Sequence, residues 1–194
     1  MTENPAPFMV VISGPNGSGK TTSAPRFLRD DLSVHEFVNA DHIAHGLSAF
    51  NPDGVAIQAG KVMLNRLKEL ARQKKNFAFE TTLASRYFAK WIREQKEKQG
   101  YLFKLIYLYL PFPELAKLRV QERVRAGGHH IPDHVIERRY HSGLDNFFKL
   151  YKPIADEWYL MDNSSLGTTQ LIASGANQEV KHIKNHELWE VLQP

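Results

Sequence analysis

The segment at residues 14–21 restricts the fold of this chain more than any other part of its sequence. It consists of Gly-Pro-Asn-Gly-Ser-Gly-Lys-Thr, which fits the pattern G-x-x-x-x-G-K-[ST]. An apolar run at residues 8–12 predicts a strand before it, and residues 20–29 are expected to form a helix after it, with Pro25 in the first two turns. Because this motif binds phosphate where it connects a strand to a helix, we predict a P-loop here.

The residue types of this loop indicate how it would bind a nucleotide. Glycines let the backbone curl so that its N–H groups point at phosphate oxygens, and the helix N-terminus adds positive potential. Lys20 is expected to bridge the terminal phosphates of ATP, and Thr21 to supply a hydroxyl ligand to Mg²⁺. The residues predicted to bind the nucleotide are Gly14, Pro15, Asn16, Gly17, Ser18, Gly19, Lys20, Thr21 and Thr22.

Strands and helices are expected to alternate along the rest of the chain. Further strands are predicted at 36–39, 77–81, 102–110 and 158–161, and helices from about Asp41 and at 53–75, 85–99, 113–126 and 132–151. Gly100 is expected to end the helix that precedes it. This alternation predicts a three-layer, doubly wound, mostly parallel α/β sheet. We expect a single domain with its core at 8–162, followed by an extension at 163–194 that holds a hairpin and a short helical turn.

Composition excludes several classes of protein. The chain has 194 residues, of which 42% are hydrophobic, a size and content that suit one globular domain. It has no apolar run of the roughly 18 to 20 residues needed to span a bilayer, and no signal peptide at its start, so we expect a cytoplasmic protein. The absence of cysteine excludes disulfides, thiolate zinc sites and cysteine nucleophiles. A net charge of +4 would suit a polyanionic nucleotide or a nucleic acid.

Asp41 is the candidate general base. It follows the second predicted strand, and the carboxyl ends of parallel strands surround the ligand crevice of such a sheet. A carboxylate there can accept the proton of a substrate hydroxyl, as a small-molecule kinase requires. The alternative is that Asp41 only caps the helix that follows it. A nucleotide-hydrolysing motor usually has an apolar strand that ends in an acidic residue, with a neighbouring carboxylate to orient water. Residues 77–80, which end in Glu80, are the nearest match, but the chain is short for such a motor.

Two arginine-rich helices are expected to cover the phosphates. They are joined by Gly127 and Gly128, a flexible turn of the kind found in closing lids. Such a helical arginine lid would neutralise charge during phosphoryl transfer. The alternative is a solvated basic helix surface. The arginines concerned are Arg119, Arg123 and Arg125 on the first helix and Arg138 and Arg139 on the second.

Taken together, these motifs resemble the zeta-toxin family, and in particular its short single-domain branch. The residues that carry the resemblance are the P-loop, Asn39-Ala40-Asp41, the segment 77–83 (Phe-Ala-Phe-Glu-Thr-Thr-Leu), and the Arg-Val-x-x-Arg-Val pattern at 119–124 that leads into Gly127-Gly128-His129. The resemblance covers residues 8–162. It implies a P-loop kinase that uses ATP and Mg²⁺ to phosphorylate a sugar hydroxyl of UDP-N-acetylglucosamine. It also implies an antitoxin protein that inhibits this kinase.

The resemblance also implies roles by position. Lys20 and Thr21 match the phosphate and magnesium residues, Asp41 matches the general base, and Glu80 and Thr82 match a pair that lines the sugar-nucleotide pocket. Arg123 and Arg139 are the favoured lid arginines, with Arg138 the alternative to Arg139 and Arg125 the alternative to Arg123 or a substrate-binding residue. The length of the chain and its Gly-Gly-His turn differ from the best-known toxins, which leaves the acceptor open.

Two other functions fit the sequence. In one, ATP switches a surface that binds a partner such as an antitoxin, and little phosphate is transferred. In the other, the chain is a nucleic-acid kinase whose aromatic side chains stack on bases. The strand and helix positions of these aromatics favour the core instead: they are Tyr107, Tyr109, Phe147, Phe148 and Tyr151.

Overall fold

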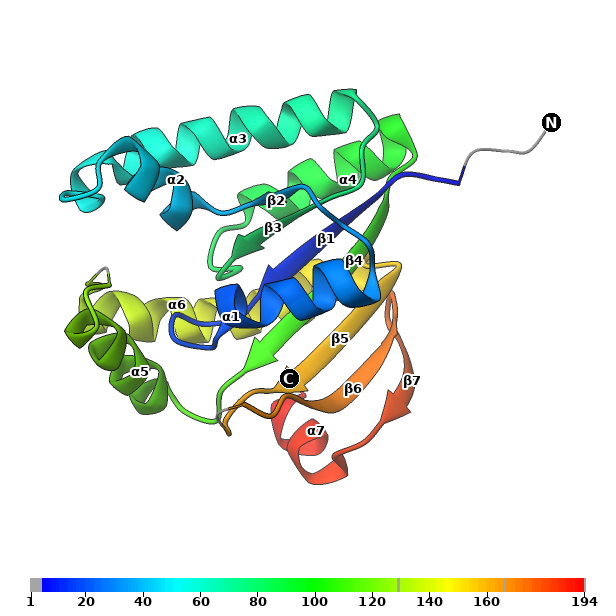
Figure 1. Cartoon of the computed structure of the whole chain (residues 1–194). Coiled ribbons are helices and arrows are strands. Elements are labelled where there is room, and N and C mark those ends of the chain that lie inside the picture. The colour runs from blue at the N-terminus through cyan, green and yellow to red at the C-terminus, as the bar shows by residue number, and fades with distance from the viewer. Residues whose placement is uncertain (1–4, 129, 166, 194) are drawn as a thin grey trace.

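The protein folds around one seven-stranded sheet (Figure 1). The computed structural model describes residues 5–128, 130–165 and 167–193. The strand order is β2-β3-β1-β4-β5-β6-β7, in which the first five strands are parallel and β6 and β7 are antiparallel. This confirms the predicted mostly parallel sheet. The strands are β1 (Phe8–Ser13), β2 (Phe37–Val38), β3 (Phe77–Thr81), β4 (Leu102–Tyr109), β5 (Glu157–Asp162), β6 (Gln170–Ala176) and β7 (Glu179–Ile183).

Helices cover both faces of the sheet and complete the three layers. The α-helices are α1 (Lys20–Pro25), α2 (Ala40–Leu47), α3 (Ala56–Arg72), α4 (Tyr87–Gln99), α5 (Pro113–Arg125), α6 (Asp133–Asn146) and α7 (His186–Leu192). Two π-helical segments, η1 (Arg26–Asp31) and η3 (Phe147–Tyr151), continue α1 and α6, and short 3-10 turns lie at η2 (Asp53–Val55) and η4 (Lys152–Ile154). Among the described residues, none of these helices is both long and apolar enough to cross a membrane.

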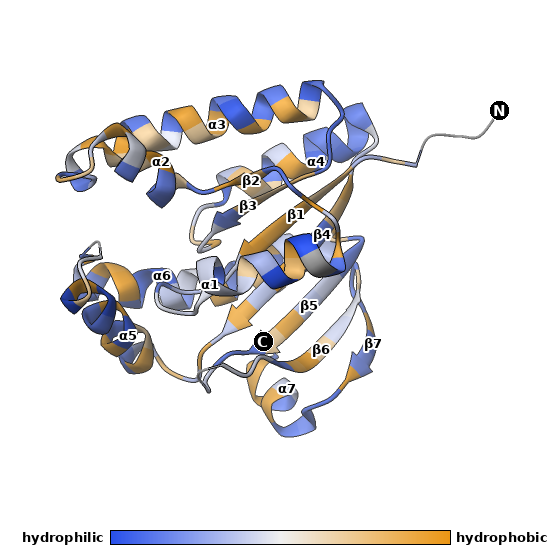
Figure 2. Cartoon of the chain, viewed as in Figure 1, coloured by the Kyte–Doolittle hydropathy of each residue, from blue (hydrophilic) through white to orange (hydrophobic). Residues whose placement is uncertain are grey.

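The apolar strand β1 explains why two helical layers form. Met9 and Val11 pack on one face of the sheet, in the core that α3, α4, η3 and α7 cover. Val10 and Ile12 pack on the other face, against α1 and η1. Because both faces are buried, the strand is hydrophobic throughout rather than alternating, and the centre of the sheet is orange in Figure 2.

Pro25 changes the helix that follows the P-loop. The predicted helix at 20–29 is α-helical only as far as Pro25 and continues as the π-helix η1 to Asp31. Proline has no N–H to donate to the preceding turn, so a change of hydrogen-bond pattern at this residue is expected. At the end of α4, Gly100 has a φ of 73° and caps the helix as predicted.

Asn39, not Asp41, caps α2, which corrects the sequence-based alternative for Asp41. The Asn39 side-chain oxygen accepts hydrogen bonds from the backbone N–H groups of Asp41, at 2.7 Å, and His42, at 3.2 Å. The helix therefore begins at Ala40, and Asp41 lies in its first turn. The carboxylate of Asp41 is thus not used as a helix cap.

The C-terminal segment packs into the main core. The predicted hairpin is β6–β7, and α7 places Trp189 against Trp158 of β5, with ring centroids 5.8 Å apart and an interplanar angle of 13°. Phe148 also packs on Trp189, with ring centroids 6.0 Å apart. Residues 170–192 therefore contribute to the stability of the same domain that carries the P-loop.

Trp189→Ala is expected to lower the free energy of unfolding by about 3–5 kcal/mol, because it removes a buried aromatic side chain and leaves a cavity. Chemical denaturation monitored by circular dichroism measures the change. Val191→Ala on the same helix is the matched control, since Val191 is exposed, and it should change the free energy by less than about 0.5 kcal/mol. Equal stability of the two variants would show that α7 is not part of the cooperative fold.

Candidate active site

The P-loop connects β1 to α1 as predicted, and close contacts fix its path. Gly14 has a φ of 138°, and a Cβ atom there would lie 2.3 Å from the Leu108 carbonyl oxygen. No other residue fits this position without moving β4. Gly17 approaches α5 in the same way, since its Cβ would lie 2.7 Å from the Ala116 carbonyl oxygen. The glycines therefore place the loop tightly between β4 and α5.

Lys20 is buried at the centre of the loop, with only 6% of its surface exposed. Its Nζ donates hydrogen bonds to the carbonyl oxygens of Gly14, at 3.0 Å, and Pro15, at 2.8 Å. Burial lowers the pKa of Lys20, and the nearby carboxylates of Glu80 and Asp41 oppose that effect. A buried ammonium held by weak carbonyl partners is well placed to bind an anion that enters the loop.

Thr21 and Glu80 together form a site that fits Mg²⁺. The Thr21 hydroxyl donates to Glu80 Oε2 at 2.8 Å, and Asn39 Nδ2 donates to the same oxygen at 2.8 Å. Glu80 Oε1 lies 3.9 Å from Lys20 Nζ. A hydroxyl and a carboxylate are the hard oxygen ligands that Mg²⁺ prefers beside phosphates. Glu80 at the end of β3 is therefore adjacent to the predicted metal ligand Thr21.

Glu80→Gln is expected to raise the Mg²⁺ concentration needed for half-maximal ATP turnover by about 10- to 100-fold, because the amide keeps the shape of the side chain but loses its charge. Magnesium titrations of turnover measure this shift. Binding of a fluorescent ATP analogue in the presence of a chelator should change little, and it serves as the control. An unchanged magnesium requirement would mean that Glu80 does not help to hold the metal.

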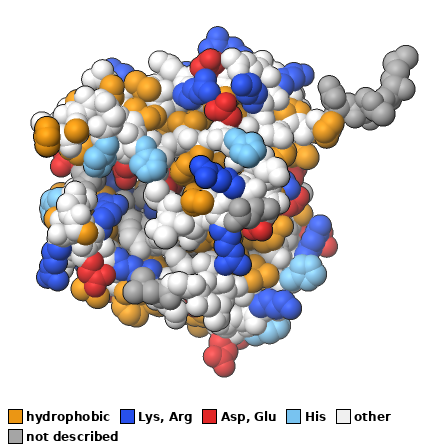
Figure 3. Space-filling model, in the orientation of Figure 1, with side chains coloured by type: hydrophobic (Ala, Val, Ile, Leu, Met, Phe, Trp, Pro, Cys, Tyr) orange, Lys and Arg blue, Asp and Glu red, His pale blue; other side chains and the backbone are white. Residues whose placement is uncertain are grey.

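Two cavities meet at the P-loop. The first, which we call the P-loop cavity, has a volume of about 550 Å³ and lies between α1, η1, α5 and the segment after β5. The second cavity, of about 840 Å³, lies between α2, α3, the segment after β3 and α6. In Figure 3 the surface is hollowed between the parts of the chain that carry α2 and α5, and charged side chains lie around the hollow. Four residues line both cavities: Asn16, Lys20, Asp41 and Glu80.

Hydrogen bonds fasten α5 and the segment after β5 to the P-loop. Arg119 donates to the carbonyl oxygens of Asn163, at 2.8 Å, and Ser164, at 2.6 Å. Asn163 Nδ2 donates to the Ser18 carbonyl oxygen at 2.7 Å, and Thr169 donates to Asn163 Oδ1 at 2.8 Å. Sequence reasoning missed Asn163 and Thr169. Asn163 directly follows β5 at the carboxyl edge of the sheet, so the rule that indicated Asp41 could have found it.

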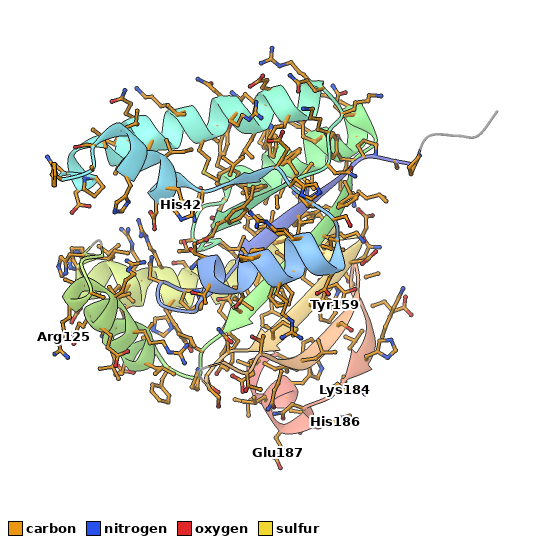
Figure 4. The ribbon with its side chains drawn as sticks, viewed as in Figure 1. His42, Arg125, Tyr159, Lys184, His186 and Glu187 are labelled. Atoms are coloured by element: carbon orange, nitrogen blue, oxygen red, sulfur yellow. The ribbon has the colours of Figure 1, made fainter. Side chains whose placement is uncertain are left out.

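The predicted arginines differ in their positions. Arg123 lines the P-loop cavity, and Arg138 and Arg139 line the second cavity. Arg139 Nη1 donates to Asn16 Oδ1 at 3.5 Å. Burial lowers the pKa of Arg139, and so does its neighbour Arg138, whereas Asp41 raises it. Arg125 is exposed at the end of α5, where Figure 4 shows it directed away from the cleft. The structure thus brings Arg123, Arg138 and Arg139 to the site but not Arg125.

Electrostatics connect two of these arginines to the P-loop lysine. Arg123 and Arg139 each lower the pKa of Lys20, although burial is the largest cause. They belong to different helices, so positive charge approaches Lys20 from both α5 and α6.

Thr82, which the resemblance assigned to substrate binding, lines the second cavity. His129 lies outside the described residues.

Comparison with solved structures shows the fold of P-loop kinases. A chain of the AvrRxo1-ORF1:AvrRxo1-ORF2 complex with sulphate ions aligns with a TM-score of 0.76 and 17% identity over 96% of this chain. This chain spans 63% of the length of that one. A chain of the PezAT chromosomal toxin–antitoxin system of Streptococcus pneumoniae aligns with a TM-score of 0.60 and 19% identity, covering 86% of this chain and 72% of its own. A gluconokinase from Sinorhizobium meliloti aligns with a TM-score of 0.50 and 14% identity, covering 82% and 84%.

Sequence comparison shows the family. An uncharacterized protein of Haemophilus influenzae is 31% identical over 131 residues, which cover 68% of this chain and 91% of that protein. The model of the AAA domain family matches residues 9–142, from the second residue of β1 to α6. That range contains the P-loop, Asp41, Glu80 and the arginines of α5 and α6. The chain therefore belongs to the AAA domain family.

Proposed function

We propose that this protein is an ATP- and Mg²⁺-dependent kinase that transfers the γ-phosphoryl group to a hydroxyl of a small molecule bound in the second cavity. The observation that carries the proposal is that the two cavities meet at Lys20, Asp41 and Glu80. A phosphotransferase needs two ligand sites that join at the transferred group, whereas a hydrolase needs one. A structure of the AvrRxo1 complex contains ATP, which supports ATP as the ligand of the P-loop cavity.

The residues at the junction suggest how transfer proceeds. Lys20 exchanges its carbonyl partners for phosphate oxygens. Thr21 and Glu80 would hold Mg²⁺, which would supply positive charge beside the phosphates. The acceptor oxygen forms a bond to the γ-phosphorus as the bond to the ADP oxygen breaks, and Asp41 takes the hydroxyl proton. Arg123 and Arg139 stabilise the charge that develops on the transferred group.

The second cavity favours an acceptor that is anionic and partly apolar. Lys61 and Arg138 line it, and neither forms an ion pair with any residue that the structure describes. Ile57 and Tyr87 also line it, although 80% and 47% of their surfaces are exposed. Exposed apolar side chains in a concave surface favour burial by a ligand. A UDP-N-acetyl sugar, which the zeta-toxin resemblance suggests, combines a diphosphate with a planar base.

Phosphate transfer from γ-labelled ATP to four related acceptors tests the proposal. N-acetylglucosamine is neutral, its 1-phosphate carries negative charge, its 4-nitrophenyl glycoside carries an aromatic ring, and UDP-N-acetylglucosamine carries negative charge and a ring. We expect the highest kcat/KM with UDP-N-acetylglucosamine. Arg138→Gln should remove the advantage of the charged acceptors over the uncharged ones. If no acceptor is labelled and ATP hydrolysis is slow and indifferent to Asp41, the kinase proposal fails and a nucleotide-switched binding protein replaces it.

We also propose a protein partner similar to an antitoxin. The PezAT system is a toxin–antitoxin pair, and the AvrRxo1 structures are complexes of two proteins. Growth arrest of a bacterial host on expression of this chain, with rescue by Asp41→Asn, would support a toxic kinase that needs such a partner. Arrest that persists in the Asp41→Asn variant would exclude kinase-dependent toxicity.

A nucleic-acid acceptor has less support. Tyr107 and Tyr109 are buried in β4, and Phe147 and Tyr151 are buried in η3. Phe148 is half-buried and packs on Trp189. These rings are therefore part of the core, as their positions in the sequence indicated, and they are not placed to stack on bases.

A further inference from the structure

Helix α6 packs directly on the backbone of the segment that follows β3. A Cβ atom on Gly143 of α6 would lie 2.3 Å from the Thr82 carbonyl oxygen. Only glycine allows the helix to approach this closely. The same segment contributes Thr82, Ala84 and Ser85 to the wall of the second cavity. Gly143 thus sets the distance between α6 and that wall.

Asn146 fixes the conformation of this segment. Its side chain is 6% exposed, and Nδ2 donates to the Leu83 carbonyl oxygen at 2.8 Å. Leu83 is fully buried and has a φ of 58°, which is unfavourable for a leucine and requires support from its surroundings. The Leu83 N–H also donates to Thr81 Oγ1 at 3.2 Å, and the Tyr151 hydroxyl donates to the Ser85 carbonyl oxygen. The strained turn is therefore held mainly from α6 and η3.

The same helix carries the arginines of the second cavity. Arg139, Gly143 and Asn146 are spaced four and three residues apart, so they lie along one side of α6. The position of Arg139 is thus tied to the position of the turn at Leu83. By contrast, α5 is tied to the P-loop cavity, because Arg119 binds the segment after β5. The two helices are thus fastened to different segments, α5 to the segment after β5 and α6 to the turn at Leu83, and Arg139 of α6 also reaches Asn16 of the P-loop.

We propose that Gly143 and Asn146 are positioning residues that couple the occupancy of the second cavity to the placement of Arg139 at the phosphates. This inference rests on the proposed kinase function. An acceptor that contacts Thr82 and Ser85 orders the turn, and the turn holds α6 where Arg139 reaches the transferred group. Without an acceptor, only contacts within the protein hold the turn, among them those of Asn146 and Tyr151, so Arg139 is held less firmly at the phosphates. Coupling of this kind favours transfer to the acceptor over hydrolysis of ATP by water.

Asn146→Leu tests the coupling, because leucine has nearly the same volume but cannot donate to Leu83. Gly143→Ala is the second test variant. Asp145→Asn is the matched control on the same helix, since the Asp145 side chain is 52% exposed and pairs only with Lys149 among the described residues. Three quantities are measured: KM for UDP-N-acetylglucosamine, the affinity for a fluorescent non-hydrolysable ATP analogue, and the amide exchange rates of residues 81–85.

Both test variants are expected to raise KM for the acceptor about fivefold or more and to speed exchange at 81–85, while ATP-analogue affinity without acceptor stays within about twofold. The control should match wild type. Faster exchange with an unchanged KM would reduce Gly143 and Asn146 to a structural role, and unchanged exchange would overturn the inference outright.

Failure of the proposed function is distinguishable from failure of this inference. If the wild type labels none of the four acceptors and its ATP hydrolysis is slow and indifferent to Asp41, the kinase proposal fails. Basal ATP hydrolysis then replaces KM as the readout. Faster exchange at 81–85 together with slower basal hydrolysis in both variants would then support the positioning of Arg139. Unchanged hydrolysis would overturn it.

Discussion

Lys20→Ala is expected to lower phosphoryl transfer about 10³-fold. The ammonium of Lys20 is the positive charge buried at the centre of the P-loop, where it is largely shielded from water. Charge stabilisation of the transferred group is the main task in phosphoryl transfer, and it is strongest in such a water-poor site. The affinity for ATP should also fall, since the lysine would contact the phosphates before transfer as well as during it. Single-turnover rates and titration with a fluorescent ATP analogue separate the two effects.

Lys68→Ala is the control for this prediction. Lys68 is an exposed lysine of α3 that lies outside both cavities. The control should transfer phosphate at the wild-type rate, and denaturation midpoints establish that both variants are folded. If folded Lys20→Ala retained more than about a tenth of the wild-type rate, the P-loop cavity would not be the site of phosphoryl transfer.

Asp41→Asn is expected to lower the rate about 10²- to 10⁴-fold, the usual contribution of general acid–base catalysis. Asparagine has the shape of aspartate but cannot take the hydroxyl proton. Because Asn39 caps α2, the substitution removes no helix cap, and the fold should be unaffected. ATP-analogue affinity should stay within about threefold, so that the loss falls on kcat. Rapid-quench measurements with a labelled acceptor are the direct readout.

Asp31→Asn controls for the loss of a carboxylate, since Asp31 is exposed and lies outside the two cavities. It should transfer phosphate normally. A fully active Asp41→Asn variant would assign proton transfer to another group or to water, while leaving the P-loop site intact.

Local patterns predicted most of the fold. The bounds predicted for β3 are those observed, and the hairpin near the C-terminus and the cap at Gly100 are present. Apolar runs that form strands, and glycines that form turns or end helices, involve only a few adjacent residues. They can therefore be recognised in the sequence. The cap of α2 was predicted at Asp41 instead of Asn39. Both residue types cap helices well, and the choice depends on where the two-residue strand β2 ends.

The sequence named candidate residues for the site but could not give their contacts. The hydrogen bond between Thr21 and Glu80 joins residues 59 apart, and the bond between Arg119 and the Asn163 carbonyl joins residues 44 apart. No local pattern predicts such a pairing. Arg123 and Arg125 are two positions apart on one helix, so they face different sides, and only packing decides which one faces the cleft. The close approach of Gly143 to Thr82 likewise depends on tertiary structure.

The junction between the two cavities has a consequence for redesign. Because they share four lining residues, most of the second cavity can be altered without touching the residues that would hold the nucleotide. Substitutions at Ile57 or Tyr87 would reshape the far wall, and the phosphate end would keep its geometry. A library of variants at these positions could therefore be screened for new acceptors with one unchanged phosphate donor. Because the acceptor wall is separate from the nucleotide site, such a domain could also acquire new acceptors during evolution by changing that wall alone.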